Sequence, residues 1–181
     1  MQALLDGLTL SSADQLREQL QSSIDRGDFS SALDLLQQAI NEEPQNQAFR
    51  VELADVMVMQ GELDDAQMAL AGIPEGTDDL DRPKARLELA QEAVGMAQIG
   101  ELIDKHQQDP DDLEVRYQLA VCGAVQREYE FALDHAMAIL QADREFRDDI
   151  GRTTMIRIFS LLGKGSELAS AYRRRMFALM H

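Results

Sequence analysis

The sequence is poor in the residues and segments that disulfide-rich or membrane-spanning proteins need. It contains no tryptophan, four prolines and one cysteine, Cys122, which cannot form an internal disulfide. No stretch approaches the roughly 18 apolar residues of a membrane helix, and the N-terminus shows no basic segment followed by an apolar run and a small-residue cleavage site. We therefore expect a cytoplasmic protein without a disulfide framework.

Positive charge is also scarce, which argues against nucleic acid as a partner. The chain has 33 acidic and 17 basic residues and a formal net charge of -16. Such a surface repels a phosphate backbone. The segment 164–181 differs, because it carries four basic residues and one acidic residue. A basic end on an acidic body suggests a specific partner.

What the sequence does contain is a two-helix repeat. Hydrophobic residues make up 45% of the chain, and no segment alternates with the period of two that is typical of strands. Units of 34 residues, the spacing of tetratricopeptide repeats, begin at Ala13 and Gln47. Each has a turn glycine, Gly27 or Gly61, and small residues where two helices would approach closely. These small residues are Ala32, Ala39, Ala54 and Ala66.

Further helix pairs extend the pattern to the end of the chain. A third unit begins at Leu113, although Arg127 replaces its turn glycine. A less regular pair, Arg82–Ala93 and Met96–Gln107, precedes it, with Asp81 as a candidate cap. The sequence predicts a last pair from Asp149 to Leu162 and from a Ser166 cap to Met180. We therefore expect an all-α, tetratricopeptide-like α-solenoid of about five antiparallel helix pairs over residues 13–181, after a lead-in or linker segment at residues 1–12. Whether residues 82–107 pack as a regular repeat is left open.

The chemistry of a catalytic or metal site is not evident. The histidines His106, His135 and His181 lack a two-ligand spacing, and a helical histidine among charges is usually solvated. Cys122 has no second cysteine in a Cys-x-x-Cys pair and is expected to be a small buried side chain. Two acidic clusters precede helices, where carboxylates act as caps. They are Asp78, Asp79 and Asp81, and Asp109, Asp111 and Asp112. We expect no enzyme activity, no metal, no cofactor and no small-molecule substrate.

Two alternatives for protein binding can be weighed from the residues. Some repeats of this kind hold a partner's C-terminal carboxylate with basic residues on successive first helices. Here those helices offer only a few arginines among many acids, so this interpretation is not favoured. The arginines are Arg17, Arg50, Arg86 and Arg116.

The last predicted helix is amphipathic. Apolar residues including Leu168, Tyr172 and Met176 fall on one face, while Arg173–Arg175 lie on another. One interpretation is a helix that caps the solenoid with solvated arginines. The other is a docking helix, because a terminal helix has no following repeat to cover its outer side.

Particular segments resemble one protein family. Ala3-Leu4-Leu5-Asp6, Leu161-Leu162-Gly163-Lys164-Gly165 and the segment from Leu168 to Met180 are similar to the C-terminal half of the bacterial YbbN/CnoX thioredoxin-like co-chaperones, or co-chaperedoxins. Members of that family carry a thioredoxin-like domain before the repeats, and this chain does not contain it.

The resemblance implies a non-catalytic co-chaperone that holds unfolded or oxidised client proteins in the cytoplasm, as part of a stress response, and passes them to a chaperonin. It also implies that the last helix contacts the chaperonin, through Tyr172, Arg173, Arg174, Phe177, Leu179 and Met180. Flexible thioether side chains suit varied apolar surfaces, so Met57, Met59 and Met68 are candidate client contacts. The alternative is a tetratricopeptide scaffold for another protein complex. Under both interpretations we expect no membrane and no nucleic-acid partner.

Overall fold

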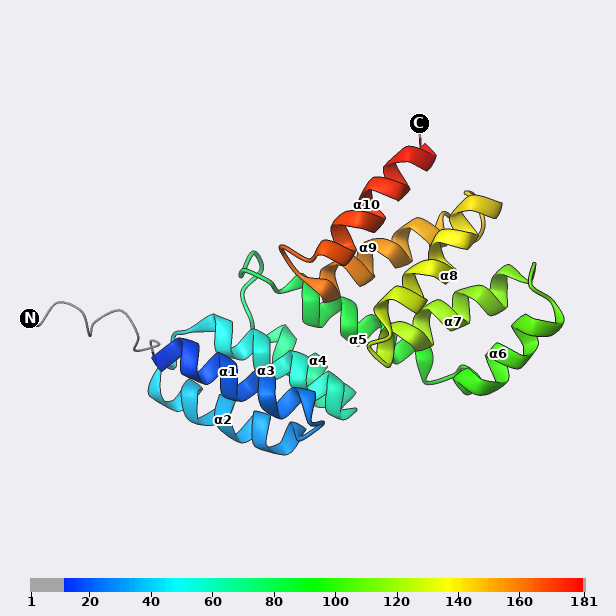
Figure 1. Ribbon diagram of the computed structural model, residues 1–181. Coiled ribbons are helices and arrows are strands. Elements are labelled where there is room, and N and C mark those ends of the chain that lie inside the picture. Colours follow the sequence, from blue (N-terminus) through cyan, green and yellow to red (C-terminus); the bar gives the residue numbers. More distant parts are fainter. Residues whose placement is uncertain (1–11, 181) are drawn as a thin grey trace, which may run out of the picture.

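The computed structural model describes residues 12–180, with side chains from residue 15, and all regular structure in that range is α-helical (Figure 1). The predicted all-α class is therefore confirmed. The helices are α1 (Ser12–Asp25), α2 (Phe29–Glu42), α3 (Gln47–Gln60), α4 (Leu63–Ala71), α5 (Asp81–Ala93), α6 (Ile99–Gln108), α7 (Leu113–Val125), α8 (Tyr129–Ala142), α9 (Ile150–Leu162) and α10 (Glu167–Met180).

The repeat pattern places the helices accurately. Helices α3 and α7 begin at the residues where the second and third units were expected to start. Gly27 and Gly61 adopt the left-handed backbone conformation, with φ of 70° and 91°. Arg127 takes the equivalent turn with φ of 65°, so an arginine occupies a conformation that favours glycine. The small residues at helix contacts are fully buried at Ala32, Ala54, Ala66, Ala120 and Ala132.

Helix α5 connects the two halves of the solenoid. It packs against α3 and α4 on one side and against α7 and α9 on the other, and it lies at the centre of Figure 1. Helix α6, in contrast, packs mainly against α7 and lies at the edge of the molecule. Residues 82–107 therefore do not form a close antiparallel hairpin. The chain turns at 94–98 before α6 begins at Ile99, three residues later than expected.

The starts of α7 and α10 confirm two of the predicted caps, and the start of α5 contradicts another. The Asp112 carboxylate accepts hydrogen bonds from the backbone N–H groups of Glu114 and Val115, at 2.9 and 3.1 Å. The Ser166 hydroxyl accepts one from Ala169 at 3.2 Å. The expected cap at Asp81 is wrong, because Asp81 is the first residue of α5 and no side chain caps that helix. The predicted lead-in segment lies outside the described residues, apart from Ser12 in α1.

The apolar core is divided along the chain. One cluster joins α1 to α2 and α3, and a second lies between α3, α4 and α5. A larger cluster holds α5, α7, α8, α9 and α10 together, including Met155, Tyr172 and Met176. Since each cluster is formed by neighbouring repeats, stability depends on contacts between successive units.

Candidate protein-binding surfaces

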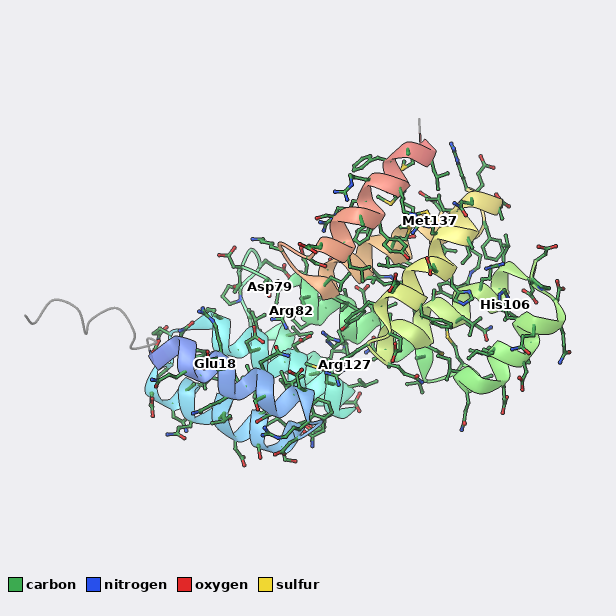
Figure 2. The ribbon with its side chains drawn as sticks, in the orientation of Figure 1. Glu18, Asp79, Arg82, His106, Arg127 and Met137 are labelled. Atoms are coloured by element: carbon green, nitrogen blue, oxygen red, sulfur yellow. The ribbon has the colours of Figure 1, made fainter. Side chains whose placement is uncertain are left out.

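A groove of about 790 Å³, which we name the central groove, lies where the two halves of the solenoid meet. It is formed by α1, α3 and α5, by the turn before α8, and by Leu161 of α9. Figure 2 shows Arg82 and Arg127 at this junction. Charged side chains form part of the lining. The apolar aliphatic and aromatic residues that line it include Leu36 of α2, and the others are Leu16, Leu20, Ile24, Ala48, Phe49, Met59 and Leu161.

A buried ion-pair network forms one wall of the central groove. Asp55 in α3 is fully buried, and its carboxylate accepts hydrogen bonds from Arg86 at 2.7 Å and from Arg82 at 2.5 Å. Arg82 also donates to Glu52 at 2.6 Å and to Asp79 at 2.8 Å. These bonds fix α5 against α3, so they set how the two halves of the solenoid meet.

Burial and charge act in opposite directions on the pKa values of this network. For Arg82, burial disfavours the charged form, but the carboxylates of Asp55, Glu52 and Asp79 outweigh it and raise the pKa. For Arg86, burial again opposes the charge, and Asp55 with the Tyr129 hydroxyl raises the pKa above its usual value. Both arginines therefore stay charged at every physiological pH.

A second polar network continues across the C-terminal half. Glu92 of α5 accepts a hydrogen bond from Arg157 of α9 at 2.5 Å and another from the Tyr117 hydroxyl of α7. Arg157 also donates to the Thr154 hydroxyl at 3.3 Å. Burial, followed by the bond to Glu92, raises the pKa of Tyr117, so its hydroxyl remains protonated and continues to donate. Helices α5, α7 and α9 are thus held in one arrangement.

Some of the residues predicted to contact a chaperonin are buried in the apolar core, and others lie on the exposed face of α10. Tyr172 is 4% exposed, and its hydroxyl donates to the Asp134 carboxylate of α8. Arg173 lies over the Phe159 ring at 4.9 Å, and Leu179 is partly buried. The outward-facing members of the set are Arg174, Phe177 (57% exposed) and Met180 (44% exposed).

The three methionines predicted to contact clients do not share one surface. Met59 lines the central groove. Met57 packs against the cluster between α3 and α5, and Met68 is exposed on α4. The structure thus brings only Met59 to the central groove.

The arginines considered for a carboxylate clamp do not form one. Arg17 and Arg86 line the central groove, but Arg86 is bound to Asp55. Arg50 and Arg116 each donate to the backbone carbonyl of a nearby proline, at 3.2 and 2.9 Å. No row of unpaired arginines therefore faces the central groove in the part of the chain that the structure describes.

The sequence did not indicate that Asp55 and Arg82 belong to a site. The available signal was Asp55 itself, because a carboxylate among the apolar residues Val51, Ala54, Val56 and Val58 of one helix must be buried and needs a cationic partner. The partner could not be found from spacing, since Arg82 lies 27 residues further along the chain.

His135, which was expected to be solvated, is buried and meets His106 between α6 and α8. The rings of His106 and His135 lie edge to face, with centroids 5.1 Å apart, and His135 also contacts the Phe131 ring at 4.6 Å. The Nδ1 atoms of both histidines are buried and have no hydrogen-bond partner among the residues that the structure describes. Within the described residues no group of three or more potential ligands is placed to hold a metal ion.

Acid is expected to weaken the fold through His135. Burial first, and then the nearby charges of His106 and Arg116, lower the pKa of His135 to about 4, while Asp134 acts in the opposite direction. The unfolded chain takes up a proton below about pH 6.5, which the folded chain does not do until about pH 4. Stability should therefore fall by roughly 2–3 kcal/mol as the pH drops across this window.

Urea denaturation at pH 7.5 and pH 4.5 measures this loss. His135→Phe removes the titrating group and should lose less stability than the wild type between the two pH values. An equal loss in both proteins would show that His135 is not responsible.

Comparison with known proteins places the repeats in a family. A profile described as tetratricopeptide repeat matches residues 23–91, and a second profile with the same description matches residues 92–181. The chain belongs to the tetratricopeptide repeat proteins. Repeats of this family typically serve as protein-binding scaffolds without catalysis. The central groove and the exposed face of α10 agree with such a role.

Other comparisons add little to the tetratricopeptide assignment. A crystal structure of a domain of a Vibrio parahaemolyticus protein of unknown function is 28% identical, covers 92% of this chain and 99% of that domain, and superposes with a TM-score of 0.41. This similarity carries no functional argument. No curated protein matches the chain. None of the described helices is long and apolar enough to cross a membrane.

Proposed function

We propose that this tetratricopeptide domain is the protein-binding part of a co-chaperone, which holds client proteins and docks on a chaperonin through α10. The observation that carries the docking role is the division of α10 into two faces. Tyr172 and Met176 are buried against the C-terminal core. Arg174 and Phe177 point away from it, and no other described helix covers them. The resemblance of this segment to co-chaperedoxins supports the choice of a chaperonin as partner.

The central groove is the surface that we assign to clients. Its apolar side chains come from several helices, and Met59 among them can adapt to different partners. The networks around Asp55 and Glu92 hold the surrounding helices in place, so the groove is formed before a client arrives. Holding clients in this way requires no catalytic residues.

Removing α10 is a poor test of docking, since the helix also stabilises the fold. A chain ending at Ala171 would lose the buried side chains of Tyr172 and Met176, together with the bond to Asp134. It would therefore melt at a lower temperature whether or not α10 binds a chaperonin.

Substitutions on the outer face of α10 test docking without disturbing the core. Arg174→Glu with Phe177→Ala is expected to weaken binding to chaperonin at least about tenfold, because both changes remove exposed side chains from a single contact surface. Size-exclusion co-migration of the purified chain with chaperonin measures the effect.

Val94→Ala is the control for loss of an exposed apolar side chain, because Val94 is 76% exposed and lies at the end of α5 rather than on α10. Unchanged co-migration of the double variant would contradict the docking role. If the wild type does not co-migrate at all, the scaffold for another complex becomes the better interpretation.

A further inference from the structure

The surface of α10 continues into a second groove, of about 830 Å³, which we name the C-terminal groove. One wall is the loop between α4 and α5, and the other is formed by α9 and α10. In Figure 1 this loop lies beside the turn between α9 and α10. The sequence pattern of α10 alone gives no connection with this loop.

The α9–α10 wall of the C-terminal groove presents apolar side chains to solvent. Ile156 is 41% exposed and Phe177 is 57% exposed, and they come from different helices. Phe159 and Met176 lie below them in the core. Two large exposed apolar side chains that converge on one hollow are typical of a contact site.

The opposite wall is acidic, and part of its charge is unbalanced. Glu75 binds Lys84 at 2.8 Å, and Asp79 binds Arg82. Asp78 and Asp81 are exposed and form no ion pair with any side chain that the structure describes. A cation that enters the groove can therefore pair with two free carboxylates.

Cationic side chains stand on the α9–α10 side. Lys164 is exposed in the turn before α10, and Arg173 stacks on Phe159. The groove is thus negative on one wall and positive on the other. A segment that carries positive charge along one edge and not along the other fits this groove in a single orientation. The reversed orientation would bring like charges together.

We propose that the C-terminal groove binds a cationic, apolar segment of a partner protein. Large apolar side chains of this segment contact Ile156 and Phe177, and its lysine or arginine side chains pair with Asp78 and Asp81. The net charge of -16 favours the approach of such a segment over an acidic one. This inference rests on the proposed docking role of α10, since Phe177 belongs to both surfaces, and it adds the α4–α5 loop to the binding site.

Two fluorescein-labelled helical peptides of equal length test the proposal. Both carry the same leucines on one face, and the flanking positions are lysine in one peptide and glutamate in the other. Fluorescence anisotropy with the full chain should show the lysine peptide binding at least about tenfold more tightly. Equal affinities would overturn the proposal.

Matched variants separate the groove from the general effect of an acidic surface. Asp78→Asn with Asp81→Asn should weaken binding of the lysine peptide about fivefold to tenfold. Asp64→Asn with Asp65→Asn makes the same change in charge at the start of α4, outside the groove, and should change affinity less than about twofold. If both pairs weaken binding equally, the carboxylates of the groove have no specific role.

The apolar wall has its own variant. Phe177→Ala should weaken binding of the lysine peptide severalfold, whereas Val94→Ala should not change it. Unchanged affinity of Phe177→Ala would also overturn the proposal.

The peptide and chaperonin assays can fail independently. Specific lysine-peptide binding without chaperonin co-migration would contradict the proposed chaperonin partner and leave the groove assignment standing. Chaperonin co-migration combined with equal binding of both peptides would contradict the groove assignment and leave the chaperonin partner standing.

Discussion

Asp55→Asn is expected to lower the free energy of unfolding by about 3–5 kcal/mol. The Asp55 side chain is 1% exposed and is the carboxylate shared by Arg82 and Arg86. Its removal leaves Arg86, whose side chain is 8% exposed, without a carboxylate, and places two guanidinium groups next to a neutral amide. Urea denaturation at neutral pH, compared with the wild type, measures the loss.

Asp79→Asn is the control for Asp55→Asn, because it removes another carboxylate partner of Arg82 by the same chemical change. The Asp79 side chain is 47% exposed, and asparagine tolerates the positive φ of 64° at this position. Its expected cost is below about 1 kcal/mol. Similar losses in the two variants would contradict the view that burial makes the Asp55 pairs essential.

A double variant shows where the energy of Asp55→Asn is lost. If the main cost is an unpaired, buried Arg86, then Asp55→Asn combined with Arg86→Met should be less destabilised than the sum of the two single variants. Additive losses would point to packing rather than charge.

Gly151→Val is expected to destabilise the protein by about 3 kcal/mol. A Cβ atom on Gly151 would lie 3.0 Å from the backbone nitrogen of Leu140 and 3.1 Å from the carbonyl oxygen of Ala136. Both are backbone atoms of α8 and cannot rotate away, so α9 would have to separate from α8. Since α10 packs against both helices, the effect should extend to the proposed docking surface.

The matched substitution for Gly151→Val is Gly100→Val. Gly100 is also helical, but a Cβ atom added to it would meet no neighbouring atom within 4 Å. Valine has a somewhat better helix propensity than glycine, so the change in stability should stay within about 0.5 kcal/mol. Thermal melts of the two variants distinguish the effects, and a small loss at Gly151 would show that α8 and α9 can separate at little cost.

Local sequence patterns were sufficient to predict most of the helices. Gln47 was identified as a helix start because the 34-residue spacing, the turn glycine and the small positions agree in its unit. Leu113 was identified from the small positions of its unit, although Arg127 replaces the turn glycine. Ser166 was identified as a cap because hydroxyl side chains commonly bond to the free N–H groups of the first helical turn. These signals act within one unit of the chain, so they can be read without knowing the tertiary structure.

The candidate surfaces were predicted less completely. Arg174 and Phe177 were named as contact residues through the resemblance to co-chaperedoxins, and the structure places both side chains at the surface. Tyr172 was grouped with them, yet its ring is buried against α8. Position on a helical wheel does not reveal how much of a face the neighbouring helix covers.

The fold class, the repeat length and the basic, amphipathic character of the last helix follow from the sequence, since each depends on residues within about 34 positions of one another. Three contacts follow from the tertiary structure instead: Asp55 pairs with Arg82, His106 meets His135, and the acidic α4–α5 loop faces Phe177. These contacts depend on how successive units rotate about one another. That rotation results from many packing contacts acting together, and no spacing in the sequence records it.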